Sequence, residues 1–73
     1  MTQIDLLSPV ALLEDIAAEG LKRGQVGTVV ERLAPEVYEV EFSDDSGQTY
    51  ASVALRTEQL MRLFHESPKP QAA

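Results

Sequence analysis

Three glycines at short spacing lead into a β-branched segment in Gly20-Leu21-Lys22-Arg23-Gly24-Gln25-Val26-Gly27-Thr28-Val29-Val30. From Gln25 onward the side chains alternate between the two faces of a predicted strand, with Val26, Thr28 and Val30 on one face. The glycine spacing matches neither the dinucleotide fingerprint nor the phosphate-binding loop, which disfavours a phosphate site. Glycine permits unusual backbone conformations and close strand crossings, so a structural role is predicted instead. The structural turn glycines assigned in this way are Gly20, Gly24, Gly27 and Gly47.

The clearest strand of the chain lies in Val37–Phe42, where apolar residues alternate with glutamates. This period of two is typical of a strand with one buried and one solvated face. The polar cluster Ser43–Gly47 predicts a tight turn into a second strand, Gln48–Ala54. Leu55–Gln59 then predicts a short helical turn, and Leu60–Phe64 a last strand. The pattern predicts two hairpins that share one strand.

The segment Ser8–Gly20 fits two structures. Its serine, the proline that follows and its closing glycine favour a helix, because these residues suit a cap, a first turn and an end. Apolar residues at positions 10, 12 and 13, followed by an acidic pair, suit a strand that ends before a loop from Ile16 to Lys22. Local signals leave both structures open.

The chain of 73 residues has room for one domain with a thin core. We expect a flexible arm over residues 1–8, the folded domain over 9–65 and a disordered tail over 66–73. Without cysteine, packing or self-association must stabilise the domain. No apolar run is long enough to span a bilayer and no targeting segment is evident, which predicts a cytoplasmic protein. The net charge of -6 makes nucleic acid an unlikely partner and favours a neutral or basic one.

No catalytic or ligand-binding constellation is evident. His65 lies beside the predicted tail without nearby partners and is expected on the solvated surface. The serines lack a histidine and an acid arranged around them. We therefore predict no catalytic residue, no cofactor and no metal site, and expect that the protein is not an enzyme. Lys22 and Arg23, with Arg32, form at most an ordinary basic patch. The aromatic residues, most of them expected in the core, are Tyr38, Phe42, Tyr50 and Phe64.

The most conspicuous polar cluster is acidic. Two of its carboxylates alternate along a strand and two follow in a turn, so they do not converge on one cation. The calcium-loop spacing is absent as well. A solvated face is expected, with a docking surface for a basic partner as the sharper alternative. The residues of this candidate partner-binding face are Glu36, Glu39, Glu41, Asp44 and Asp45.

Over about residues 9–64 the chain resembles a known family. The resemblance rests on the run of residues 20–30, on the strand Tyr38–Phe42, and on Asp45, Gly47, Thr49, Ala51 and Leu55. This family comprises short bacterial single-domain proteins, best represented in cyanobacteria, that are known only as a domain of unknown function. It implies a five-stranded SH3-like barrel and favours a strand at Val10–Asp15, which we adopt. More distantly, the segment is similar to the SH3-like domain of nitrile hydratase β subunits and to KOW segments of ribosome-associated proteins, but architecture does not transmit function.

The sequence thus predicts an all-β fold, a small five-stranded SH3-like barrel with a short helical turn before the last strand. The predicted function is a non-enzymatic protein-protein interaction module that self-associates, because strand edges template strand addition and a thin core benefits from an interface. One alternative is a KOW-like nucleic-acid or ribosome-associated barrel, whose topology fits and whose charge does not. Another is an antitoxin or immunity partner of a basic bacterial protein.

Overall fold

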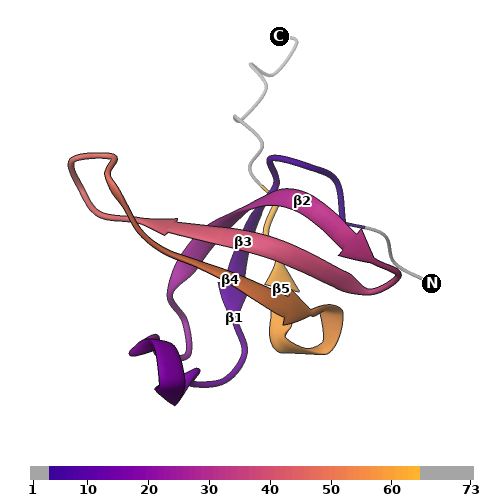
Figure 1. Ribbon diagram of the computed structural model, residues 1–73, viewed down its shortest axis with the longest axis horizontal. Helices are drawn as coiled ribbons and strands as arrows, with labels where there is room; N and C mark the ends of the chain where they lie inside the picture. The colour runs from indigo at the N-terminus through magenta and orange to yellow at the C-terminus, as the bar shows by residue number, and fades with distance from the viewer. Residues whose placement is uncertain (1–3, 65–73) are drawn as a thin grey trace, which may run out of the picture.

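The computed structural model describes residues 4–64, which form one antiparallel sheet of five strands in the order β4-β3-β2-β1-β5 (Figure 1). The strands are β1 (Pro9–Leu12), β2 (Val26–Ala34), β3 (Val37–Ser43), β4 (Thr49–Arg56) and β5 (Leu60–Arg62). Two single 3-10 turns accompany them, η1 (Ala17–Glu19) and η2 (Thr57–Gln59). The all-β fold and the short helical turn before the last strand are therefore confirmed. His65 and the predicted tail over 66–73 lie outside the described residues.

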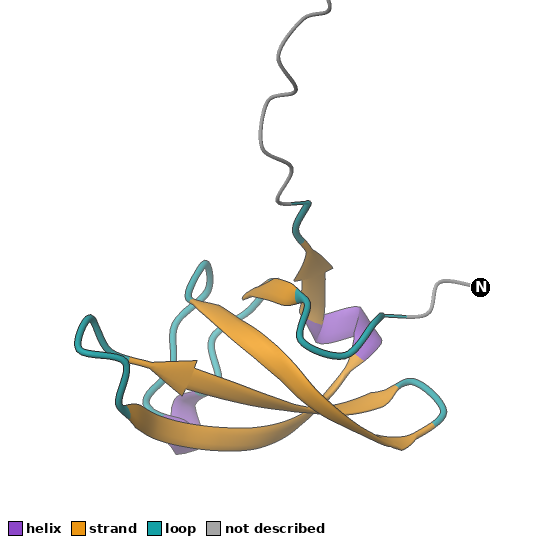
Figure 2. Ribbon diagram, turned by 90° about the horizontal axis from the view of Figure 1, so that it is seen from above, coloured by secondary structure: helices purple, strands orange, loops and turns teal. Residues whose placement is uncertain are grey.

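The sheet bends so that β3 and β4 run across β1 and β5 (Figures 1 and 2). The long strand β2 belongs to both halves, since Val26–Thr28 pair with β1 and Thr28–Ala34 pair with β3. A register shift between Val29 and Glu31 marks an irregularity in this strand. The inner face carries the buried core residues Ile4, Val10, Leu12, Leu21, Val29, Tyr38, Val40, Phe42, Leu55 and Leu60.

Strand β3 follows the predicted alternation. Tyr38, Val40 and Phe42 are buried on the inner face, while Glu39 and Glu41 lie on the outer face and stay partly exposed. Cross-strand partners on β2 and β4 bond this strand on both edges. The central strand of the two hairpins is therefore the part of the core that the sequence pattern located directly.

At Gly27 the backbone of β2 lies close against residues of β3. A Cβ atom at this position would lie 2.7 Å from Val40 Cγ1, 2.8 Å from the Glu41 carbonyl oxygen and 2.8 Å from Phe42 Cε2. Any side chain would therefore have to displace both backbone and core. The other glycines occupy turns with left-handed φ angles, and these are Gly20 at 70°, Gly24 at 92° and Gly47 at 86°.

The first element is a strand and not a helix. Pro9 to Leu12 pair with β2 on one edge and with β5 on the other, and Val10 and Leu12 enter the core. Ser8, the candidate helix cap, instead bonds to the sheet, because its carbonyl oxygen accepts the N–H of Val29 at 3.0 Å. Tertiary pairing thus overrides local propensity. No helix within residues 4–64 is long and apolar enough to cross a membrane.

Several details differ from the sequence-based expectations. A flexible arm is expected over residues 1–8, but the described part of this segment is bonded to the sheet at Ile4 and Leu7. Ile4 is buried and its N–H donates to the hydroxyl of Tyr38 at 3.2 Å, while the N–H of Leu7 donates to the Val29 carbonyl at 2.6 Å. Of the aromatic residues, Tyr50 and Phe64 are exposed at the surface. These differences arise because long-range contacts of the first residues and the register of β4 leave no signature in local sequence.

Candidate functional site

The predicted acidic face does not form one site. Glu39 and Glu41 share the outer face of β3, but Glu36 lies in the turn before this strand and Asp44 and Asp45 lie in the turn after it. The two turns project at opposite ends of the molecule (Figures 1 and 2). Within residues 4–64 no group of three or more histidine, aspartate or glutamate residues could hold a metal ion.

Two of the predicted acids, Asp44 and Glu36, form hydrogen bonds that stabilise the turns in which they lie. Asp44 Oδ1 accepts the Ser46 hydroxyl at 2.6 Å, the Ser46 N–H at 2.9 Å and the Gln48 N–H at 3.0 Å. The Ser46 hydroxyl, followed by the Gln48 N–H, holds the pKa of the Asp44 carboxyl below its ordinary value of 3.8. Glu36 has a φ of 67° and its Oε1 accepts the Thr57 hydroxyl at 3.1 Å. Both acids therefore have a structural use.

The two glutamates of β3, Glu39 and Glu41, gain a third acidic neighbour from β2. In the sheet register Glu31 lies directly opposite Glu39, and Glu41 lies two residues further along β3. We call Glu31, Glu39 and Glu41 the acidic patch. The Ser52 hydroxyl donates to Glu39 Oε2 at 2.6 Å, but none of the three carboxylates takes part in an ion pair with a described residue. Like charges opposite one another destabilise a sheet, so a positive partner would relieve repulsion here.

A second surface feature is apolar, and the local sequence pattern does not predict it. Met61 on β5, Ala11 on β1 and Val26 on β2 lie in one cross-strand row on the outer face. Leu13, the residue that follows β1, is a further exposed apolar side chain beside this row. We call these four residues the apolar strip. Val26, Met61 and Leu13 are 54%, 48% and 45% exposed, whereas the small side chain of Ala11 is buried. Detecting the strip requires the register of three strands that are distant in the chain.

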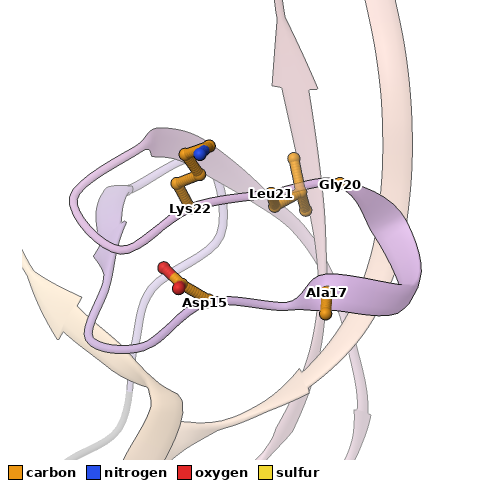
Figure 3. Close-up of a pocket in the computed structure, with 5 residues that line it drawn as sticks. All are labelled: Asp15, Ala17, Gly20, Leu21 and Lys22. Carbon is orange, nitrogen blue, oxygen red and sulfur yellow. The ribbon is translucent and has the colours of Figure 1, made fainter.

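The loop between β1 and β2 forms a shallow hollow lined by Asp15, Ala17, Gly20, Leu21 and Lys22 (Figure 3). Its polar groups hold the loop together. Asp15 Oδ1 accepts the Arg23 N–H at 2.8 Å, and the Lys22 N–H donates to Gln25 Oε1 at 2.6 Å. The lining offers one carboxylate and one amine and thus no set of groups for acid-base or nucleophilic chemistry.

The predicted basic patch is not assembled. Lys22 and Arg23 belong to the loop before β2, whereas Arg32 lies opposite Tyr38 near the far end of that strand. A strand rises about 3.3 Å per residue, which separates the two positions by most of the length of β2. Within residues 4–64 these three basic residues therefore do not form one patch.

The family described as Domain of unknown function (DUF4926) matches residues 6–62. The match spans most of the chain and all five strands, so the chain belongs to this family. This finding confirms the resemblance to a domain of unknown function. No curated protein and no solved structure matches the chain.

Proposed function

We propose that this chain is a non-enzymatic interaction module that self-associates through the apolar strip. The observation that supports the proposal is the cross-strand row of Met61, Ala11 and Val26, extended by Leu13, on the outer face of three strands. Clustered apolar side chains on a small surface are typical of protein interfaces. Their burial stabilises an assembly by roughly 25 cal/mol per Å² of apolar surface removed from water.

Charge favours the strip over the acidic patch as the face through which two copies would meet. The net charge of -6 makes two chains repel one another. None of the four strip residues carries a charge, whereas the outer face of β3 carries the acidic patch. Two copies therefore meet with least repulsion when strip faces strip. A homodimer of this kind also adds burial to a domain whose own core is small.

The alternatives draw unequal support. The strand order with β1 paired to β5 supports the SH3-like resemblance, on which the KOW-like alternative rests. A nucleic-acid surface needs clustered basic residues, however, and Lys22, Arg23 and Arg32 are dispersed. An antitoxin or immunity role requires a basic partner, for which the acidic patch is the supporting feature.

The proposal is tested by sedimentation velocity over a range of protein concentrations. We expect the wild type to dimerise at micromolar concentration and Val26→Lys or Met61→Lys to weaken dimerisation at least about tenfold, which corresponds to about 1.4 kcal/mol. Leu33→Lys is the matched control, because Leu33 is also an exposed apolar residue of β2 but lies outside the strip. Thermal melting verifies that each variant is folded. A wild type that stays monomeric, or equal weakening by Leu33→Lys, would contradict the proposal.

A further inference from the structure

Strand β4 has a free edge. It is the terminal strand of the sheet, and among residues 4–64 it pairs only with β3. The N–H of Thr57 donates to the Glu36 carbonyl at 3.0 Å, which fixes the phase of the antiparallel ladder. Because hydrogen-bonded and non-hydrogen-bonded pairs alternate, the N–H and C=O groups of Ser52 and Ala54 point away from β3. The N–H of Arg56 points the same way and donates to Gln59 Oε1 at 2.8 Å.

The open part of this edge lacks the usual protection against strand addition. From Gln48 to Leu55 the chain carries no charged residue and no proline. Natural edge strands are commonly guarded by lysine, proline or short length. The opposite edge of the sheet differs, since β5 is only three residues long. Strand addition from another chain is therefore favoured at β4.

The outer face beside this edge selects the chemistry of the added strand. Ser52 lies opposite Glu41 and Ala54 lies opposite Glu39, so only small side chains separate the acidic patch from the edge. Strands lie about 4.8 Å apart, and alternate residues of an added strand would face outward next to Ser52 and Ala54. A lysine or arginine at these positions can extend across the small side chains to the carboxylates.

We propose that the free edge of β4 binds an extended segment of a partner protein with basic residues at every second position. The intervening residues are apolar, because Ala51 and Val53 lie half-buried on the inner side of β4 and pack against the core. A second copy of this chain is disfavoured at the edge, since pairing two β4 strands would bring two acidic patches together. This binding mode extends beyond the self-association proposed above and uses a different surface.

The probe is an acetylated and amidated octapeptide of alternating lysine and valine, titrated into the full chain by calorimetry and by amide NMR. We expect binding with shifts at the amides of Ser52 and Ala54 and an affinity that falls with added salt. The matched peptide of alternating glutamate and valine should not bind. N-methylation of one alternating set of peptide amides should abolish binding, while N-methylation of the other set should not. Equal binding of both N-methylated peptides would overturn strand addition.

Protein variants test the charge requirement. Glu39→Gln/Glu41→Gln should weaken binding of the lysine-valine peptide about three- to tenfold, in keeping with the loss of two exposed ion pairs. Glu14→Gln/Glu19→Gln removes the same charge from the loop region between β1 and β2 and should weaken binding less than about twofold. Equal loss in both double variants would overturn a local role for the acidic patch. Met61→Lys should retain peptide binding, which separates this proposal from self-association.

Discussion

Strands β1 and β3 have similar inner faces and opposite outer faces. Both bury large apolar side chains in the core, Val10 and Leu12 from β1 and Phe42 among those from β3. The outer face of β3 presents glutamates, whereas the outer face of β1 carries Ala11 and the strand is followed by the exposed Leu13. A strand with one solvated face alternates apolar and polar residues, and a strand covered on both sides is apolar throughout. β1 has the apolar composition of a covered strand, and the proposed self-association would supply that cover.

The largest expected effect tests the inner face of β3. Phe42→Ala should lower the free energy of unfolding by about 4 kcal/mol, because it empties a fully buried site in a small core. Glu41→Ala, on the outer face of the same strand, should change it by less than about 0.5 kcal/mol. Urea unfolding followed by circular dichroism measures both. Similar values for the two variants would show that the faces of β3 are assigned wrongly.

The next effect tests the tight contact between Gly27 of β2 and the residues of β3. Gly27→Val should cost about 3 kcal/mol, at the upper end of the usual range for overpacking, because the added Cβ meets backbone as well as side chains. Thr28→Val adds no bulk and lies on the exposed outer face, so its stability should remain within about 0.5 kcal/mol of the wild type. Calorimetric melting gives the comparison, and a stable Gly27→Val protein would contradict the close approach of the two strands.

A third prediction compares the buried leucine at the end of β1 with the exposed leucine that follows it. Leu12→Ala should cost about 2.5 kcal/mol, since this side chain is buried in the core. Leu13→Ala removes the same atoms from the outer side and should cost less than about 1 kcal/mol at a protein concentration where dimers are absent. Urea titrations at low and high concentration separate folding from association. Equal costs at low concentration would mean that the outer side of β1 is already covered within one chain.

The smallest effect concerns the turn that follows β3. Because the folded-state pKa of Asp44 is lowered, its contribution to stability is complete above the ordinary value of 3.8 and is lost as the pH falls through the lower folded value. Asp44→Asn should therefore reduce stability slightly at neutral pH and flatten the decline in strong acid. Asp45→Asn changes the same charge in the same turn and serves as the control. Identical acid-unfolding curves for the two variants would contradict the assigned hydrogen bonds.

The contrast between β1 and β3 also explains how far the sequence could predict the fold. The alternating glutamates of β3 define its faces, so that strand and the hairpins around it were predicted from local pattern. β1 is apolar on both sides, which removes the period of two, and the local signals of Ser8, Pro9 and Gly20 favour a helix there. The strand assignment there came from a family resemblance. Pairing with β2 and β5 selects the strand at this position, and local sequence does not encode this pairing.

The candidate surfaces were harder to predict than the fold. Neighbouring acids in the sequence suggested one face, but an extended strand separates Glu36 from Asp44, and each of them serves a turn. Glu31 joins the patch from another strand because the register shift in β2 places it opposite Glu39. The apolar strip likewise depends on register across three strands. Such surfaces become visible only when strand pairing is known.

The pairing of β1 with β5 has a consequence for the rate of folding. Val10 lies opposite Arg62, so the first and last strands meet only after almost the entire described chain has been brought together. Strands β2, β3 and β4 are joined by short turns and can pair locally. Contacts between distant segments slow folding, because the entropic cost of closing the loop comes before the contacts can stabilise the chain. During synthesis, the edge of β1 that pairs with β5 therefore remains unpaired until β5 has been made. An apolar strand with an unpaired edge is prone to aggregation.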